Sequence, residues 1–282
     1  MSNLEPTIRI NVDVTNPGQF FACCGLLELA HRLWPTTEGW FDAGRFLLSV
    51  PSVTDTEIIG TCLTVLRKCI LQADDSRGKD AVHPIRITYE SHVDLMLDWW
   101  IDQNGNKGPF KLWAGQQTSL RIMQALRNAL PSPSDISCGE LFDQGAALTG
   151  RFGVDPRAAW NALDSGFSPN TQHMEVYSYP AVELLAAVGL QGFRPREIIR
   201  ETRQHAYATQ TRTTRSSDQQ EIARNPSWQY ATWSSSLPSS VARVASAGIV
   251  STGRTAKYRF EIAARGSYKG FRFAISTIGD ES

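Results

Sequence analysis

Residues Asn16 to Trp34 read NPGQFFACCGLLELAHRLW, and this stretch decides the centre of the fold. Asparagine caps helices well and proline suits a first helical turn, so the stretch predicts a helix that begins near Pro17. Glu28 is the only charged residue between Phe20 and Ala30, which predicts burial on most faces. A glycine inside a helix costs about 1 kcal/mol relative to alanine. Gly25 therefore indicates that another backbone packs closely at this point.

A second segment echoes the first. Ala22-Cys-Cys-Gly25-Leu26 and Ala186-Ala-Val-Gly189-Leu190 each follow two large apolar residues and, further upstream, a proline. The second copy predicts another short apolar helix from Pro180 to Leu190. Two related strand–helix units would explain the echo, and so would chance among helices rich in Ala, Leu and Gly.

The remaining elements follow from periodicity and turn signals. A capping box at Thr54–Glu57 begins a helix, and Asn104–Pro109 predicts a turn. At the C-terminus, Tyr258, Phe260 and Ile262, then Phe271, Phe273 and Ile275, alternate with polar residues and predict a hairpin with one core face. Further strands are expected at 7–14, 84–89 and 228–233, a strand or hairpin at 39–50, and a helix at 119–130. We expect a single α+β domain over 1–282, a mixed sheet with packed helices.

Charge divides the chain into two unequal parts. Residues 191 to 272 carry fourteen Lys or Arg against five Asp or Glu, whereas residues 1 to 190 carry fourteen against twenty-one. The basic part is a credible electrostatic footprint for a polyanion. Within it, Ala208 to Ser227 (ATQTRTTRSSDQQEIARNPS) has almost no large apolar residue, so it cannot offset its own ordering entropy. A nucleic-acid backbone would order it; a solvated loop with scattered arginines is the alternative.

Composition excludes several classes of protein. Five cysteines without metal-ligand spacing argue against a secreted disulfide framework. The segment MSNLEPTIRI lacks the features of a signal peptide, and the longest apolar run, Phe20 to Leu27, is too short to span a bilayer. We expect a soluble cytoplasmic protein that does not contact a membrane.

No catalytic centre is predicted. The five histidines are dispersed, and the sequence has no His-Glu-x-x-His, Walker or Gly-x-Ser-x-Gly motif. Asp94, Asp98 and Asp102 recur every four residues, which on a helix would gather three carboxylates, although such repeats usually mark a solvated face. We expect a protein that is not an enzyme and binds no metal or cofactor.

Basic and amide residues offer a better lead. Lys107, Lys111, Gln116 and Gln117 surround a turn before a helix that carries Arg121, and lysines contact phosphates as point charges. A hairpin with solvent-exposed lysines explains this segment equally well. The segment from Arg151 to Arg157 is typical of a self-contained Arg–Asp turn. Candidate nucleic-acid contacts in the basic part are Arg194, Arg196, Arg203, Arg212, Arg215 and Arg224.

Four segments together resemble a known family: NPGQFFACCGLLELAHRLWP (16–35), KLWAGQQ (111–117), RFGVDPRAAWNALDSGFSPN (151–170) and YPAVELLAAVGLQGFRP (179–195). They are similar to the third of the b-named proteins of type I-U CRISPR systems, also called type I-G. The resemblance touches both halves of the chain. It implies a subunit of, or an accessory to, a Cascade-like effector that holds CRISPR RNA (crRNA) and recognises invading DNA. It also implies a ferredoxin-like fold of the repeat-associated RNA-binding superfamily, or a role in place of the large subunit.

Three functions follow from this. The first is a non-catalytic effector subunit that binds crRNA, target DNA or both, beside other CRISPR effector subunits. The second is a crRNA-processing endoribonuclease, which needs a general base near a 2′-hydroxyl; His205, beside the arginine-rich segment, is the candidate. The third is a scaffold whose acidic first part docks on basic neighbouring subunits.

Overall fold

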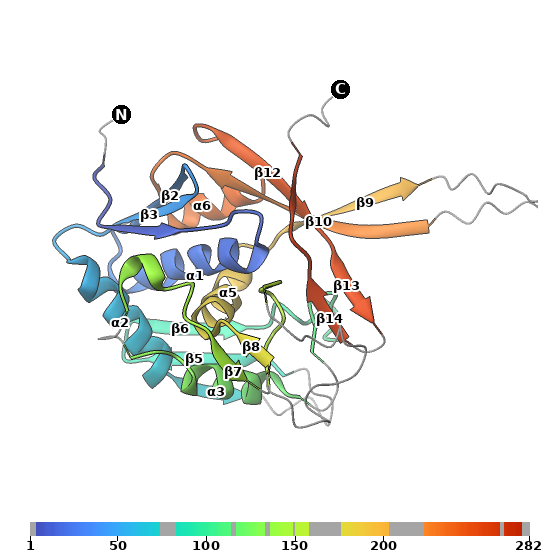
Figure 1. Cartoon of the computed structure of the whole chain (residues 1–282), viewed down its shortest axis with the longest axis horizontal. Coiled ribbons are helices and arrows are strands. Elements are labelled where there is room, and N and C mark those ends of the chain that lie inside the picture. Colours follow the sequence, from blue (N-terminus) through green and yellow to red (C-terminus); the bar gives the residue numbers. More distant parts are fainter. Residues whose placement is uncertain are drawn as a thin grey trace, which may run out of the picture.

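The protein is described by a computed structural model in which residues 4–73, 83–113, 117–132, 136–148, 150–157, 176–202, 223–265 and 268–277 are placed (Figure 1). A continuous cluster of buried apolar side chains extends from Ile8 to Ala274. Five helices and several small sheets surround it, so the expected α+β class is confirmed. Every strand pair in these ranges is antiparallel. Separate antiparallel sheets therefore take the place of the one mixed sheet that we expected.

Two helices cross at the centre of this core. They are α1 (Pro17–Leu33) and α5 (Pro180–Gly192), and they lie between the β1–β3–β2 sheet and the β5–β6 strands (Figure 1). A Cβ atom on Gly25 would lie 1.8 Å from the carbonyl oxygen of Leu185, and one on Gly189 would lie 2.0 Å from that of Phe21. The predicted close approach at Gly25 is confirmed. Its partner is the other copy of the echoed motif, so mutual packing accounts for a glycine in each copy.

The start of α1 follows the sequence prediction. Asn16 is the N-cap residue, and its side chain accepts a hydrogen bond from the Gln19 backbone N–H. Every residue from Pro17 to Ala30 is buried. Within the buried stretch, Glu28 bonds to Ser239 and Arg243 of α6 (Ser239–Ser246). Burial raises the pKa of Glu28, but these hydrogen bonds outweigh it and hold the pKa below its usual value.

The first sheet covers one side of the helix pair. Its order is β1 (Ile8–Asn11), β3 (Arg45–Ser49), β2 (Glu38–Asp42) and β11 (Leu237–Pro238). β2 and β3 form the expected hairpin, with Ala43 and Gly44 at its turn in positive-φ conformations. The strand that follows helix α2 (Asp55–Lys68) does not join this sheet. β11, almost two hundred residues from β2, pairs at the β2 edge instead.

The second sheet belongs to the basic part of the chain. Its order is β15 (Ile275–Ser276), β12 (Thr255–Phe260), β10 (Ala223–Trp233) and β9 (Arg196–Thr202). The indole of Trp233 donates to the Gly39 carbonyl (2.8 Å), and the hydroxyl of Tyr230 donates to the Val14 carbonyl (2.7 Å). The Trp233 hydrogen bond connects the second sheet to the first sheet, and the Tyr230 hydrogen bond connects the second sheet to the loop before α1.

The remaining sheets and α3 lie on the other side of the helix pair (Figure 1). A three-stranded sheet contains β4 (Ile70–Ala73), β5 (Ile85–Tyr89) and β6 (Val93–Leu97). Helix α3 (Ser119–Asn128) packs near α5, and a short 3₁₀ helix, η3, spans Cys138–Glu140. β7 (Ala146–Leu148) pairs with β8 (Val176–Ser178). None of the helices in the described ranges is long and apolar enough to cross a bilayer.

One part of the C-terminal hairpin prediction is wrong. β13 (Ile262–Arg265) and β14 (Tyr268–Phe271) do pair, and Phe260 and Phe271 are buried. However, Phe273 is 48% exposed and Ile275 is 56% exposed, although alternation placed both in the core. The reason is a break in strand geometry after Phe271. There the Ala274 N–H donates to the Thr15 carbonyl, and Ala274 is the buried residue.

The helix crossing yields a direct test. Replacing Gly25 with alanine should lower the free energy of unfolding by at least about 3 kcal/mol, because the new methyl group collides with rigid backbone. The matched control is Gly139→Ala, since a Cβ there would meet nothing within 4 Å. The control should change stability by less than about 1 kcal/mol. Chemical denaturation measures both, and equal stability for the two variants would contradict the packing argument.

Candidate nucleic-acid interface

The most prominent feature that carries candidate arginines is a two-stranded ribbon. β9 and β10 pair from Arg196↔Gln229 to Ala223↔Thr202, and Figure 1 shows the ribbon projecting from the body of the molecule. β12 accompanies β10 only from Trp228 to Trp233. Beyond Trp228, β10 pairs with β9 alone in the described part of the chain. The outer part of the ribbon, in which Arg224 lies across from Glu201, therefore has no third strand beside it within the described ranges.

The candidate arginines lie differently around this ribbon. Arg196 is exposed at the base of β9. Arg194 is also exposed, but its guanidinium bonds to the Asp98 carboxylate (2.6 Å), so an internal ion pair occupies it. Arg224 lies in β10 across from Glu201, as the backbone register shows. Arg203, Arg212, Arg215 and His205 lie outside the described residues, as does most of the segment from Ala208 to Ser227.

The turn 107–113, which carries Lys107 and Lys111 and is called the lysine turn below, forms a second candidate surface. The expected turn is present, with an isolated bridge between Ile101 and Lys107 and a positive φ at Gly105. Lys107 is exposed. Lys111 is only 8% exposed, its ammonium donates to the Trp113 carbonyl, and it lies 5.1 Å from the centroid of the Trp113 ring. The alternative interpretation, a hairpin with solvent-exposed lysines, thus fits Lys107 but not Lys111.

A third lysine joins this turn from the opposite end of the chain. The backbone N–H of Lys269, in β14, donates to the Leu112 carbonyl (3.2 Å), and the Lys269 side chain is exposed. Burial, followed by the charges of Lys107 and Lys269, lowers the pKa of Lys111 to about 8. Sequence reasoning missed Lys269 because β14 reaches the turn only through the tertiary fold.

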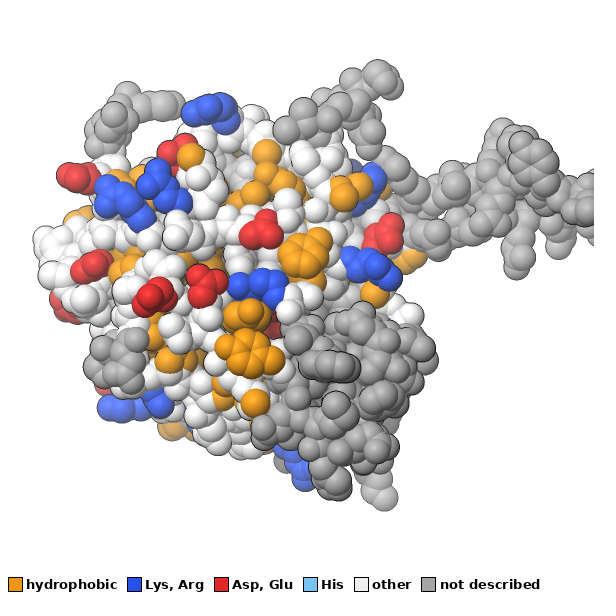
Figure 2. Space-filling view, viewed as in Figure 1, with side chains coloured by type: hydrophobic (Ala, Val, Ile, Leu, Met, Phe, Trp, Pro, Cys, Tyr) orange, Lys and Arg blue, Asp and Glu red, His pale blue; other side chains and the backbone are white. Residues whose placement is uncertain are grey.

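The other candidates do not gather at either feature. Arg121 is exposed on α3, which lies away from the projecting ribbon (Figure 1). The Gln117 amide lies beside Gly150, and Gln116 lies outside the described residues. On the face shown in Figure 2, the basic side chains alternate with acidic ones and form no continuous patch. The lysine turn and the ribbon are therefore the two surfaces that remain.

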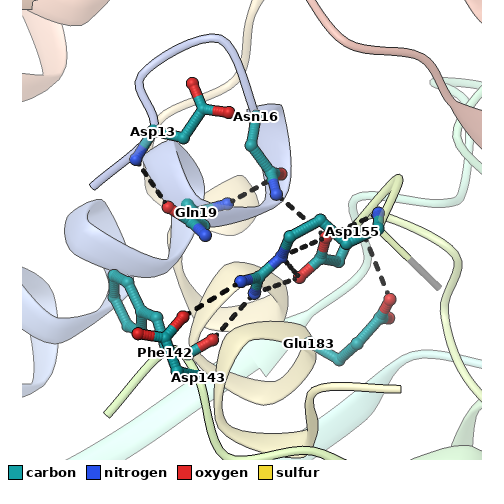
Figure 3. A network of polar contacts seen from close by, with 8 residues as sticks. Asp13, Asn16, Gln19, Phe142, Asp143, Asp155 and Glu183 are labelled. Carbon is teal, nitrogen blue, oxygen red and sulfur yellow. Dashed lines mark hydrogen bonds and ion pairs between the residues drawn. The ribbon is translucent and has the colours of Figure 1, made fainter. Parts of the chain in front are cut away.

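A buried polar network links the starts of the two central helices (Figure 3). The Asp155 carboxylate accepts from the Asn16 amide (2.9 Å) and forms an ion pair with Arg157. The expected Arg–Asp pair is therefore present, but the turn is not self-contained, because Asn16 joins it from the start of α1. The Glu183 carboxylate, in the first turn of α5, accepts from the backbone N–H groups of Phe152, Gly153 and Asp155. Burial raises the pKa of Glu183 to about 7. The network positions a loop and does not expose reactive groups.

The acidic repeat has a structural explanation. Asp94 lies in strand β6 rather than on a helix, so Asp94, Asp98 and Asp102 do not share a helix face. Each has its own partner: Arg86 for Asp94, Arg194 for Asp98, and the Asn104 and Asn106 backbone for Asp102. Within the described ranges, no group of three or more His, Cys, Asp or Glu could hold a metal ion.

The buried network can be tested through the two carboxylates that share Arg157. Asp155 is fully buried, whereas Asp143 is 67% exposed. Asp155→Ala should cost about 3 to 5 kcal/mol, because it leaves buried partners unpaired. Asp143→Ala should cost less than about 1 kcal/mol, as exposed ion pairs do. Urea denaturation of both variants gives the comparison, and similar costs would show that burial does not determine the strength of this network.

Comparisons with known proteins add no identification. No protein-family model matches the chain, and neither the curated proteins nor the solved structures contain a match.

Proposed function

We propose that the protein is a non-catalytic, nucleic-acid-binding subunit of a type I CRISPR effector complex. In this role it contacts crRNA, target DNA or both through the β9–β10 ribbon and the lysine turn, and it packs against other effector subunits. The observation that carries the proposal is the ribbon, because β9 and β10 project from the folded body and flank an arginine- and hydroxyl-rich stretch of the sequence, residues 203 to 222.

The shape and the arginine content of the ribbon favour phosphate contacts. The ribbon and the stretch between its strands, residues 196 to 227, contain six Arg against four Asp or Glu, and most protein–nucleic acid hydrogen bonds involve the sugar–phosphate backbone. The segment between β9 and β10 is rich in arginine, hydroxyl and amide groups, all of which donate to phosphate oxygens. It contains one tyrosine, so base stacking should be minor. Binding should therefore depend strongly on salt and weakly on sequence.

The CRISPR assignment is supported by the resemblance and by where its segments lie. α1 and α5 contain two of the four resembling segments, and the Gly25–Gly189 crossing joins them. Residues 151–157 bind the first turns of both helices, and the ring of Trp113 packs at 5.5 Å from that of Phe152. The described residues of the four segments therefore meet in one region. A family resemblance that includes contacting core residues is a pattern that a shared fold produces.

We also propose that the N-terminal third derives from a ferredoxin-like unit. The elements β1–α1–β2–β3–α2–β4 occur in the β-α-β-β-α-β order of that unit, and the order β1–β3–β2 within the sheet is the ferredoxin-like one. The fourth strand departs from the pattern, because β4 joins β5 and β6 while β11 extends the sheet at its β2 edge.

The ribbon can be tested through salt dependence. Replacing Arg203, Arg212, Arg215 and Arg224 with alanine should weaken binding to every nucleic-acid sequence tested. The log–log salt slope should fall by about 3 to 4 units, at roughly 0.7 to 0.9 per lost phosphate contact. Fluorescence anisotropy at several salt concentrations measures both quantities on folded protein or assembled complex.

A charge-matched variant controls for this experiment. Arg9, Arg45, Lys68 and Arg254 are exposed basic residues away from the ribbon and the lysine turn. Replacing these four with alanine should leave both affinity and slope nearly unchanged. If the two variants behave alike, the ribbon is not the binding surface, and the scaffold function becomes the better account.

Catalysis is tested separately at His205. For a protein that only binds, His205→Ala should leave crRNA maturation unchanged, because no matched acid–base pair is predicted beside this residue. The measurement is the length of crRNA recovered from cells that carry the variant. Accumulation of unprocessed precursor in an intact complex would establish the endoribonuclease function instead.

A further inference from the structure

The surroundings of Lys111 contain hydrogen-bond donors in excess. The Trp113 carbonyl is the one hydrogen-bond acceptor that contacts the Lys111 ammonium within the described ranges, and a lysine ammonium has three donor hydrogens. None of the described carboxylates forms an ion pair with Lys107, Lys111 or Lys269. A nearly buried cation beside two further cations is unfavourable unless an anion joins them.

The aromatic side chains beside Lys111 add more unsatisfied donors. Trp99, Trp100 and Trp113 pack edge to face, with ring centroids 5.1 to 6.4 Å apart. Each indole N–H is buried and has no hydrogen-bond partner in the part of the chain that the structure describes. An indole N–H donates and never accepts, and a buried donor left unpaired costs about 1 to 3 kcal/mol. Three such donors in one cluster are unusual, since buried polar groups are nearly always bonded.

The backbone holds this cluster in a fixed arrangement. Three chain segments meet here: the turn 107–113, the loop 150–157 and strand β14. The Lys269 N–H donates to the Leu112 carbonyl, and the Phe271 N–H donates to the Gly153 carbonyl (3.1 Å). Phe110 packs between Trp228 and Phe271, at 5.3 and 5.7 Å. The lysines are therefore brought together by the fold and not by sequence proximity.

We propose that Lys107, Lys111 and Lys269 form a binding site for one phosphate group beside the Trp113 ring. Phosphate supplies the two things that the cluster lacks, which are negative charge and several acceptor oxygens. Lys111 is the buried anchor, and the two exposed lysines attract the anion and close over it. The inference deepens the proposed function and rests on it for the source of the phosphate, which is the backbone of a bound strand.

The indole N–H of Trp113 provides a direct readout by NMR. Inorganic phosphate, added to the full-length protein at constant ionic strength, should shift the Trp113 indole ¹H–¹⁵N cross-peak to saturation. Lys107→Gln/Lys269→Gln should weaken this binding about tenfold or more, because two charge-assisted contacts are lost. The control Lys68→Gln removes an exposed lysine elsewhere and should leave the titration unchanged. These substitutions lie on the surface, so folding is retained, and sequential assignment identifies the cross-peak without a further variant.

A second titration with a single-stranded RNA that lacks terminal phosphates identifies the source. A shift of the same cross-peak by this RNA, in competition with phosphate, supports both the site and the proposed function. A shift with phosphate alone supports the site and assigns it to a free phosphate compound, against the proposed function. RNA binding that leaves the cross-peak and the double variant unaffected would overturn the site while the proposed function stands. No shift with either probe would also overturn the site.

Discussion

The close crossing of α1 and α5 is the constraint on which the rest of the structure depends. Gly25 and Gly189 each lie against the backbone carbonyl of the opposite helix, so neither position has room for a side chain. The crossing brings residues from both halves of the sequence into one core. Sheets then cover the helix pair on both sides, and the Asn16–Asp155–Glu183 network fixes the loop that contacts both helix starts. The lysine turn packs against this loop through Trp113 and Phe152, so the position of the candidate phosphate site follows from the helix crossing.

The uneven distribution of charge along the sequence can be related to the positions of the charged residues in the fold. The basic C-terminal part supplies the β9–β10 ribbon, which extends from the body, and β14, which contributes Lys269 to the turn of Lys107 and Lys111. Several acidic residues instead form contacts within the protein. Glu28 and Glu183 are buried hydrogen-bond acceptors, and Asp94 and Asp98 form ion pairs with arginines. The guanidinium groups of Arg194 and Arg157 likewise form ion pairs within the protein, with Asp98 and Asp155 respectively. Net charge alone therefore overstates the number of arginines that are free to contact a ligand.

Local sequence signals predicted the helices well and the long-range contacts poorly. The caps at Asn16 and Thr54, the burial of α1 and the close approach at Gly25 could all be predicted, because each depends on neighbouring residues or on one steric rule. The exposure of Phe273 and the strand position of Asp94 could not, since alternation and four-residue spacing do not reveal where a strand ends or begins. The burial of Lys111 and the arrival of Lys269 depend on the tertiary fold. Only the unusual KLWAGQQ sequence, with a lysine between apolar residues, marked this site in advance.

The central claim is that this fold presents a nucleic-acid-binding surface within a larger effector assembly. The most direct measurement is purification of the tagged protein expressed together with its neighbouring genes, followed by sequencing of the bound nucleic acid and mass spectrometry of the bound proteins. The account predicts a ribonucleoprotein that contains CRISPR repeat sequences and the products of the neighbouring genes. A clean monomer, free of nucleic acid and of partner proteins, would contradict it.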